Sequence, residues 1–593
     1  MKRIFRIFIL LFFSLVVCDK ANRSGGKLQT PDYLAVQQAA ERFSPAIGVY
    51  GGEMVLPMLS VPSSLNPITA TDPAANELTR LIYEGLVRID GVTLTPQPGL
   101  ARSWDMSPDG LAWTFHIRQG LQWSNGAAFS AYDVAFTFTT CIYNDSITPN
   151  PARNLFIING KKASITVVDS LTVRFDLPAP FAPFLRAMSQ EILPKHKYAQ
   201  YVRRGRFSAY LGIQTPPDSV VGTGPFLPEL YVPLQKIVLK KNPLYWQKDS
   251  AGHRLPYLEK LVYMVVPDHE AEVARFKRGE CDYLMAAGED FLGLQKDTTK
   301  GAYAIYRIGP ATGSNFLVFN QNAARDAATG KPYRDSIKLS WFKNVLFRKA
   351  VAFSIDKKAM ANVAFNGMGY PQWSPMSPSE GYYYNPDVAQ YAFDSAKAAE
   401  ALLSAGFRYR GSDSVWEDGA GHAVEFSIVT NNGNVAREKI AEIICKNLGK
   451  LGFKVHCRIL WFADLIRTID NPPFDWDAAL LGLSGGAEPQ ISEKVWRSSQ
   501  ALHVWFPGQK SPATPWEARI DSIFDAAGRE MDENKRKTLY DEWQRIAADN
   551  VPLIFTVLPE RIVCCARKFK NINPSLYGGL LHNIERLYIQ PSK

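Results

Sequence analysis

The fold is decided by the stretch Leu100-Ala101-Arg102-Ser103-Trp104, followed by Ser107-Pro108-Asp109-Gly110 and Trp113-Thr114-Phe115-His116-Ile117-Arg118. Apolar and polar side chains alternate along residues 111–118, which predicts a strand. Turn dipeptides lie on both sides of it, Asp109-Gly110 and Asn125-Gly126, and residues 131–141 then predict a helix. We expect Trp104, Trp113 and Trp123 to be core aromatics, so this stretch has a structural role rather than a ligand-binding one.

Helix and strand patterns alternate along the rest of the chain, and this alternation indicates an α/β protein. Helices are predicted over residues 344–365, 395–405, 437–451, 516–527 and 534–549. Strands are predicted over residues 54–59, 454–460, 475–483 and 552–558. A helix over residues 437–451 leads into the strand over 454–460, and the strand over 475–483 follows. This rhythm fits βαβ units, which are typical of a parallel sheet.

Length and charge limit the classes of protein to consider. The chain has 593 residues, which predicts two or three domains. Its net charge of +10 is modest for this size, and no block of Lys and Arg is interleaved with aromatics, so we expect no nucleic-acid partner. The eight His are scattered and no CxxC or HExxH occurs, so neither a metal nor another cofactor is expected.

The N-terminus has the pattern of an export signal. Three basic residues precede the apolar residues 7–17, a stretch too short to span a bilayer. Leu15-Val16-Val17-Cys18 resembles a bacterial lipobox, which predicts a signal peptide over residues 1–17 and an acylated Cys18 that anchors the protein to a membrane. Ordinary signal-peptide cleavage is the alternative. The polar residues 18–45 are predicted to be the tether of that anchor.

Six further cysteines are widely spaced and form no recognisable disulfide framework. Cys445 and Cys457 lie on either side of a predicted helix-to-strand turn. Two interpretations of this pair are open, a disulfide or two buried free thiols, and we favour the free thiols.

The stretch that opens this section resembles the signature block of the family 5 extracellular solute-binding proteins, relatives of the dipeptide- and oligopeptide-binding proteins. The match continues through Gly120, Trp123-Ser124-Asn125-Gly126, Phe129-Ser130-Ala131 and Asp133-Val134. Other blocks agree in the right order: Leu81-Ile82-Tyr83-Glu84-Gly85-Leu86-Val87, Gly222-Thr223-Gly224-Pro225-Phe226, Tyr245-Trp246, Arg348-Lys349-Ala350-Val351 and Leu451-Gly452-Phe453-Lys454-Val455. The resemblance covers about residues 54–590.

This resemblance implies a bilobed α/β fold of the periplasmic-binding-protein type, class II, with an extra inserted domain. By position, lobe I takes residues 46–80, 217–310 and 550–593, the inserted domain takes 81–216, and lobe II takes 311–549. The chain crosses between the lobes near residues 310 and 550, which are the expected hinge.

The resemblance also implies a function. We expect a monomer in the periplasm or cell envelope that captures a small solute, a peptide or peptide-like compound, between its lobes. It would deliver this solute to the permease of an ABC importer and would not be an enzyme. A ligand sensor or a chaperone with the same binding fold is the alternative.

Peptide-binding members of the family hold the ligand's ammonium group with an Asp shortly after a strand that ends in Gly-Trp. The corresponding stretch here is Leu481-Gly482-Leu483-Ser484-Gly485-Gly486-Ala487-Glu488-Pro489, which has neither that Trp nor that Asp. Glu488 is therefore either a substitute anchor or a surface residue, and we favour the surface residue. The glycines either let main-chain groups reach a ligand or form a plain turn.

From this comparison we predict a set of ligand-binding residues. Core packing is the alternative role for the two tryptophans among them. The set is Asn315, Phe316, Trp373, Trp461, Leu483, Ser484, Gly485, Gly486, Ala487 and Glu488.

A remote alternative comes from another class of protein. Gly482-Leu483-Ser484-Gly485-Gly486 fits G-x-S-x-G, the nucleophile elbow of serine hydrolases. Asp521 and His582 follow in the required order, but Pro489 disfavours the helix that must come directly after an elbow. A serine hydrolase that uses Ser484 is therefore kept only as a hypothesis.

Overall fold

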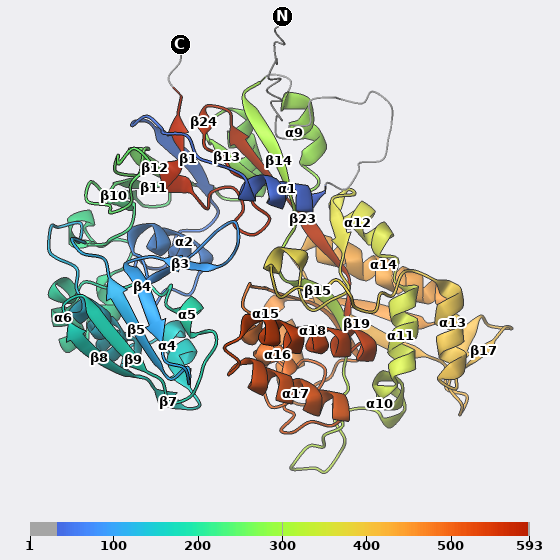
Figure 1. Cartoon of the computed structure of the whole chain (residues 1–593). Coiled ribbons are helices and arrows are strands. Elements are labelled where there is room, and N and C mark those ends of the chain that lie inside the picture. The colour runs from blue at the N-terminus through green and yellow to red at the C-terminus, as the bar shows by residue number, and fades with distance from the viewer. Residues whose placement is uncertain (1–31, 299–300, 591–593) are drawn as a thin grey trace, which may run out of the picture.

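The computed structural model describes residues 32–298 and 301–590, and it is built from two lobes and an inserted domain (Figure 1). Lobe I lies at the upper left of Figure 1, the inserted domain below it and lobe II to the right. The predicted signal peptide and Cys18 lie outside the described residues. None of the described helices is long and apolar enough to cross a membrane.

Lobe I contains two sheets. The first has the strand order β1, β12, β11, β10, in which only β1 and β12 are parallel. The second has the order β13, β23, β14, and β16 pairs with the start of β23. The bounds are β1 Glu53–Met58, β10 Phe226–Val232, β11 Lys236–Lys241, β12 Lys260–Val265, β13 Tyr283–Ala286, β14 Tyr303–Pro310, β16 Gly369–Pro371, β23 Val557–Ala566, α2 Pro73–Ile82, α8 His269–Lys277 and α9 Phe291–Asp297.

The inserted domain is an antiparallel sheet of order β4, β5, β9, β8 with helices packed against it. The predicted strand over residues 111–118 is β5, and the predicted helix over 131–141 is α3 followed by a turn of wider helix, η1. One hydrophobic cluster runs from β1 and α2 into β5 and β9, so the inserted domain and lobe I share a core. The bounds are β4 Ala101–Met106, β5 Ala112–Ile117, β8 Ser164–Asp169, β9 Thr172–Asp176, α3 Ala131–Ala135, η1 Phe136–Ile142, α4 Pro151–Phe156, α5 Phe184–Ala187 and α6 Lys195–Arg203.

The predicted structural role of the signature stretch agrees with where its tryptophans lie. Trp113 and Trp123 are buried, and the partly exposed Trp104 packs against the same cluster. A contact also joins two of the other blocks, because the half-buried Glu84 accepts a hydrogen bond of 2.9 Å from the indole N–H of Trp246. These blocks therefore build the body of the protein.

Lobe II is built on one mixed sheet of order β20, β19, β21, β15, β22. The predicted parallel pairing is confirmed for β19, which is parallel to β20 and to β21, whereas β15 pairs antiparallel with β21 and with β22. The bounds are β15 Ser314–Phe319, β19 Glu425–Asn431, β20 Lys454–Leu460, β21 Ala478–Leu483 and β22 Leu553–Phe555.

Helices cover both faces of the lobe II sheet. Successive side chains of a strand point to opposite faces, so one strand contributes to a core on each side. Leu317 and Phe319 belong to the core on the α14 face, and Phe316 and Val318 belong to the core on the α15 face. The helix bounds are α10 Ser336–Lys343, α11 Val345–Ser354, α12 Lys357–Phe365, α13 Ser395–Ser404, α14 Val435–Leu451, α15 Phe462–Asp470, α16 Glu493–Trp496, α17 Pro515–Ala527 and α18 Glu533–Asn550.

The single helix predicted over residues 344–365 is two helices, α11 and α12. Ile355 has an extended backbone that ends α11, and the side chain of Asp356 accepts a hydrogen bond from the N–H of Ala359 and caps α12. An Asp at this position stabilises a new helix start, and the apolar periodicity on both sides hides the break.

β14 of lobe I leads into β15 of lobe II through residues 311–313, and β22 of lobe II leads into β23 of lobe I through Thr556. A turn of lobe II, η4 (Pro378–Glu380), holds the first crossing. Ser377 donates to the carbonyl of Ala311 at 2.8 Å, and the carboxylate of Glu380 accepts from the N–H of Gly313 at 2.8 Å. The first of these crossings comes directly after residue 310, and the second lies six residues beyond residue 550.

The predicted tether is too long at its C-terminal end. Residues 33–41 form the helix α1, Tyr33–Glu41, capped by Asp32. The amide of Gln37 donates to the carbonyl of Val92 at 2.6 Å, and the ring of Tyr33 packs edge-on against Tyr370. These contacts hold α1 against the body, so a tether can extend no further than about the start of this helix.

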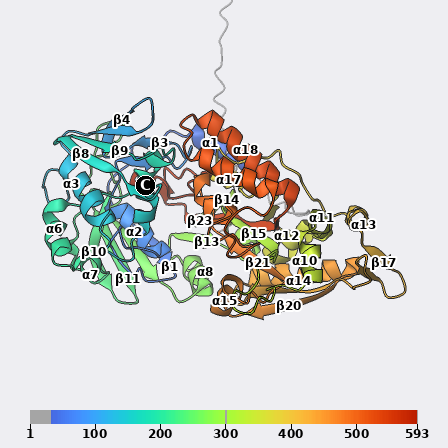
Figure 2. The ribbon, with the colours of Figure 1, turned by 90° about the horizontal axis from the view of Figure 1, so that it is seen from below.

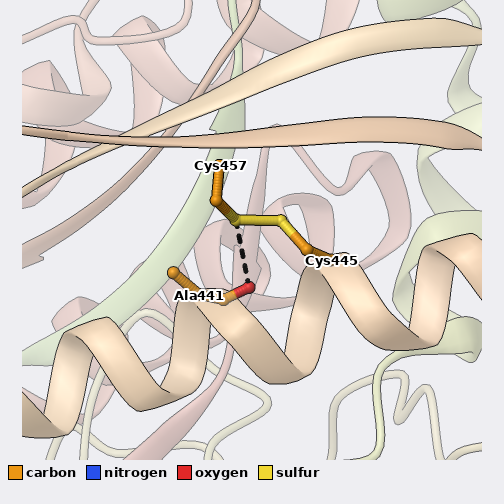
Figure 3. The surroundings of a disulfide bond; sticks show 3 residues. All are labelled: Ala441, Cys445 and Cys457. Carbon is orange, nitrogen blue, oxygen red and sulfur yellow. Dashed lines mark hydrogen bonds between the residues drawn. A yellow bond between two sulfur atoms is a disulfide. The ribbon is translucent and has the colours of Figure 1, made fainter.

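The prediction of free thiols at Cys445 and Cys457 is wrong, because the two residues form a disulfide (Figure 3). The bond joins α14 to β20, and the sulfur of Cys457 lies 3.4 Å from the carbonyl oxygen of Ala441. The other cysteines in the described ranges, Cys141, Cys281, Cys564 and Cys565, are buried thiols.

Candidate functional site

The carboxyl ends of the three parallel strands of lobe II meet at one edge of the sheet. From β19 the chain runs through α14 to β20 on one side, and from β21 it runs through α16, α17 and α18 to β22 on the other side. Strands whose connections leave in opposite directions open a crevice between their carboxyl ends, and ligands of α/β proteins bind there. The edge between β19 and β21 is therefore the candidate site.

This carboxyl edge collects three of the predicted ligand-binding residues. Trp461 follows β20 and is 71% exposed, Leu483 ends β21, and Asn315 of β15 lies opposite Gly482. Figures 1 and 2 both place α15, which begins directly after Trp461, on the flank of lobe II that faces lobe I and the inserted domain. An exposed indole at this position is available for stacking against a ligand.

A cation that the sequence prediction missed lies at the centre of this edge. Arg437, in the first turn of α14, donates to the side-chain oxygen of Asn431 at 2.6 Å and to that of Asn315 at 3.3 Å. Partial burial lowers its pKa, and no carboxylate in the described ranges pairs with it. A basic residue in the first turn of a helix is unfavourable because of the helix dipole. An Arg at the start of the predicted helix over residues 437–451 was therefore the sequence feature that could have pointed to Arg437.

The loop after β21 is open to solvent over part of its length. Ser484 and Gly485 are exposed, and Gly486 and Ala487 are partly exposed. A side chain on Gly485 would overlap the carboxylate of Glu380, so glycine is required for the loop to pack on the turn that holds the interlobe crossing. Burial raises the pKa of Glu380 to about 7.

Glu488 has a different role from either of those considered. It is 7% exposed, so the surface interpretation is wrong. Its carboxylate is paired with the guanidinium of Arg536, and it also accepts from the N–H of Gln490 at 3.0 Å. Because both carboxylate oxygens are already engaged, nothing in this geometry supports Glu488 as an anchor for a ligand's ammonium group.

Two other predicted site residues are wholly or partly buried. Phe316 is 0% exposed and belongs to the core on the α15 face, so the prediction that it faces the ligand is wrong. Trp373 is partly buried against Lys357, whose ammonium nitrogen lies 3.5 Å from the ring centroid and donates to the carbonyl of Gln372 at 2.8 Å. Burial holds the pKa of Lys357 well below its usual value.

The serine hydrolase hypothesis finds no geometric support. Asp521 accepts from the N–H of Ser498 at 2.9 Å, and His582 contacts the carbonyl of Asn573 at 2.8 Å. Within the described ranges neither is hydrogen-bonded to Ser484, and the loop after β21 leads to the short turn η5 (Pro489–Ser492) instead of a helix. The elements of a nucleophile elbow are therefore not assembled around Ser484.

Two hollows of about 640 and 480 Å³ lie outside the carboxyl edge. The first is in the inserted domain, against α3 and α6. The second is lined by residues of the signature stretch and of lobe I, among them Arg102, Arg118 and Trp246. Groups of three or more His, Cys, Asp or Glu arranged to hold a metal ion do not occur among the described residues.

Comparison with known proteins gives the identity of the fold. Residues 95–498 match the model of the bacterial extracellular solute-binding proteins, family 5. The chain belongs to this family. The resemblance seen in the signature block is thus confirmed, and so is the bilobed periplasmic-binding-protein fold.

Relatives of this family 5 protein align along most of its length. A probable ABC transporter-binding protein of Deinococcus radiodurans is 29% identical and covers 83% of this chain and 84% of its own. The oligopeptide-binding protein AppA of Bacillus subtilis is 24% identical and covers 86% of both chains.

Solved structures show the same fold at lower identity. AppA of Bacillus subtilis in complex with a nonapeptide has a TM-score of 0.67 at 22% identity and covers 92% of this chain and 100% of its own. NikA of Brucella suis in complex with Fe(III)-EDTA has a TM-score of 0.74 at 21% identity and covers 91% and 100%.

Proposed function

We propose that this family 5 protein captures a peptide or peptide-like solute at the carboxyl edge of lobe II and delivers it to the permease of an ABC importer. The observation that carries the proposal is the match to the family model over residues 95–498. The oligopeptide-binding relative AppA, and its structure with a nonapeptide, make peptide the preferred class of solute. Catalysis has no part in this function.

The geometry of the carboxyl edge supports a peptide in extended conformation. Ser484 and Gly485 are exposed, and in this proposal their N–H and C=O groups bind a ligand backbone as an added strand would. The indole of Trp461 supplies apolar contact area beside it. In this proposal Asn315, Trp461 and residues 483–487 contact the solute, and closure of the lobes buries it.

The proposal extends to the membrane. An acylated Cys18 would hold the protein in the cell envelope, near the permease, and residues between this Cys and α1 would be the tether. Mass spectrometry of the mature N-terminal peptide tests this part. A diacylated or triacylated Cys18 supports it, whereas an unmodified N-terminus at another residue contradicts it.

Native mass spectrometry with a peptide digest tests the proposed function. The purified protein is incubated with a tryptic digest of casein, exchanged into volatile buffer and examined for mass shifts. We expect bound peptides of defined masses and a raised Tm, because ligands that bind only the folded state stabilise it. The proposal fails if no peptide is retained and a solute of another class, such as an oligosaccharide or a metal chelate, raises the Tm instead.

A further inference from the structure

The helix α6 and the turn after it carry a block of positive charge on the inserted domain. Residues 195–206 contain five Lys and Arg and no Asp or Glu, whereas the other residues of 81–216 contain eight Lys and Arg and nine Asp and Glu. The net positive charge of the inserted domain therefore comes entirely from this basic block. Its charged side chains are Lys195, Lys197, Arg203, Arg204 and Arg206.

The charges of the basic block are not neutralised by neighbours. Within the described ranges none of its five side chains forms a salt bridge, whereas Arg153, Arg174 and Arg186 of the same domain lie beside carboxylates. Four of the five are exposed, and Lys197 is partly exposed. A concentration of exposed like charges creates a local positive potential that attracts polyanions.

Aromatic side chains accompany these charges. Tyr198 and Tyr201 lie within the basic block, so the expectation that no block of Lys and Arg is interleaved with aromatics is wrong here. The ring of Tyr201 stacks on that of Tyr210, with the centroids 3.4 Å apart. On α3, Tyr132 is 53% exposed, and the ammonium nitrogen of Lys195 lies 5.4 Å from the centroid of its ring.

The hollow of about 640 Å³ described above opens beside the basic block. Lys195, His196 and Arg203 of α6 line it, together with Tyr132. Asp133 also lines it, but this residue is 4% exposed and its carboxylate accepts from the main-chain N–H of Lys195 at 2.9 Å. The hollow therefore presents cations and an aromatic ring to solvent.

The basic block lies apart from the candidate solute site. Figures 1 and 2 both place α6 at the outer edge of the inserted domain, on the side away from lobe II. None of the residues that line the hollow belongs to the carboxyl edge of the lobe II sheet. A partner at α6 is thus distinct from the captured solute.

We propose that the basic block binds the anionic phosphate headgroups of a membrane, so that the inserted domain lies against the lipid surface. The family is named for extracellular proteins, and outside the cytoplasm lipid headgroups rather than nucleic acids are the polyanion at hand. Exposed Lys and Arg are attracted to such a surface, and the amphipathic ring of Tyr suits the level of the headgroups. The contact goes beyond solute capture and requires no acylation of Cys18.

Sedimentation with lipid vesicles tests the proposal. The chain without residues 1–18, which lacks the predicted signal and acylation site, is mixed with vesicles of phosphatidylcholine alone or of equal parts phosphatidylcholine and phosphatidylglycerol. We expect the protein to sediment with the anionic vesicles only. High salt should release it, because exposed charges are screened.

A triple variant locates the contact. Binding to the anionic vesicles should fall about 30- to 100-fold, because each basic residue near an anionic surface strengthens binding about 5-fold. The apo Tm and the retention of peptides should not change, since the substituted side chains are exposed and lie away from the solute site. The substitutions are Arg203→Gln, Arg204→Gln and Arg206→Gln.

A second triple variant is the matched control. It removes the same number of positive charges from exposed lysines of α14 and β20, and it should bind the anionic vesicles as the unaltered protein does. Equal weakening in both triple variants would show that only net charge matters and would overturn the proposal. The control substitutions are Lys446→Gln, Lys450→Gln and Lys454→Gln.

Three other results would also overturn the proposal. The first is sedimentation with both kinds of vesicle or with neither. The second is release by inorganic phosphate at constant ionic strength, which would assign the hollow to a free phosphate ion. The third is binding to a DNA duplex without binding to anionic vesicles, which would assign the basic block to a nucleic acid. All of these results leave peptide capture in lobe II untouched.

Discussion

The guanidinium of Arg536 on α18 lies against the carboxylate of Glu488, with Nη1 3.0 Å from Oε2, and both side chains are buried. The pair joins the loop after β21 to the last helix of lobe II. Arg186 of the inserted domain lies 3.9 Å from the same carboxylate, and the N–H of Ala182 donates to the carbonyl of Gly528 at 2.8 Å. Glu488 thus connects the loop after β21 to α18 and also lies next to Arg186 of the inserted domain.

Arg536→Gln is expected to lower the free energy of unfolding by about 3 to 5 kcal/mol, because it leaves Glu488 buried without a counter-charge. Urea denaturation measures this value. The matched control is Arg519→Gln, which breaks the exposed pair of Arg519 with Glu542 between α17 and α18 and should cost less than about 1 kcal/mol. Equal losses of stability in the two variants would show that the buried Arg536–Glu488 pair stabilises the fold no more than the exposed Arg519–Glu542 pair.

Glu84→Gln should make stability less dependent on pH. Burial raises the pKa of Glu84 to about 8, partly offset by the N–H of Trp246 and the hydroxyl of Tyr245. The folded protein therefore keeps a proton that the unfolded chain loses near its usual pKa of 4.5, and stability falls as pH rises from about 4.5 to 8. The loss is at most about 5 kcal/mol, from 1.36 kcal/mol per pKa unit.

Denaturation midpoints measured from pH 5 to pH 8 test this dependence. A Gln retains both hydrogen bonds, since its carbonyl accepts from Trp246 and its amide donates to Tyr245. Glu542→Gln is the control, because the pKa of Glu542 is lowered and its charge does not change in this range. If the denaturation midpoint of Glu84→Gln depended on pH as steeply as that of the unaltered protein, the raised pKa of Glu84 would be contradicted.

Replacing Cys445 and Cys457 together by Ser should lower the free energy of unfolding by about 3 kcal/mol. A cross-link over a loop of this size removes conformational entropy from the unfolded chain and so raises its free energy by about that much. Alkylation of the denatured protein followed by peptide mapping checks the bond itself. Both cysteines should be labelled only after reduction, whereas Cys564 should be labelled without it.

Trp461→Ala should weaken solute binding about 10-fold and leave the apo Tm unchanged, because an exposed indole contributes contact area to a ligand but little to the fold. Isothermal titration with a peptide retained from the digest measures the affinity. Phe393→Ala removes an aromatic side chain that is also exposed, in the segment before α13. A comparable loss of affinity in both variants would argue against a contact at Trp461.

The sequence by itself determined the family, the α/β class and most elements of lobe II. The strand over residues 454–460 and the helix over 516–527 agree with β20 and α17 to within one residue, because apolar periodicity is local and each element carries its own pattern. The break at Asp356 was missed because a cap and a solvent-exposed Asp look alike in one dimension. The turn dipeptides and tryptophans of the signature stretch were likewise decisive for the fold.

Only the tertiary structure decided the chemistry of the candidate site. Glu488 and Arg536 are 48 residues apart in the chain, and Arg437 and Asn315 are 122 apart. Whether a carboxylate is neutralised, a cation is left without an anion or two thiols meet depends on how distant segments are placed by the packing of the sheet. Hydrophobic patterning specifies which face of an element is buried, but the charges of its neighbours come from other parts of the chain, and these are brought together only by the fold.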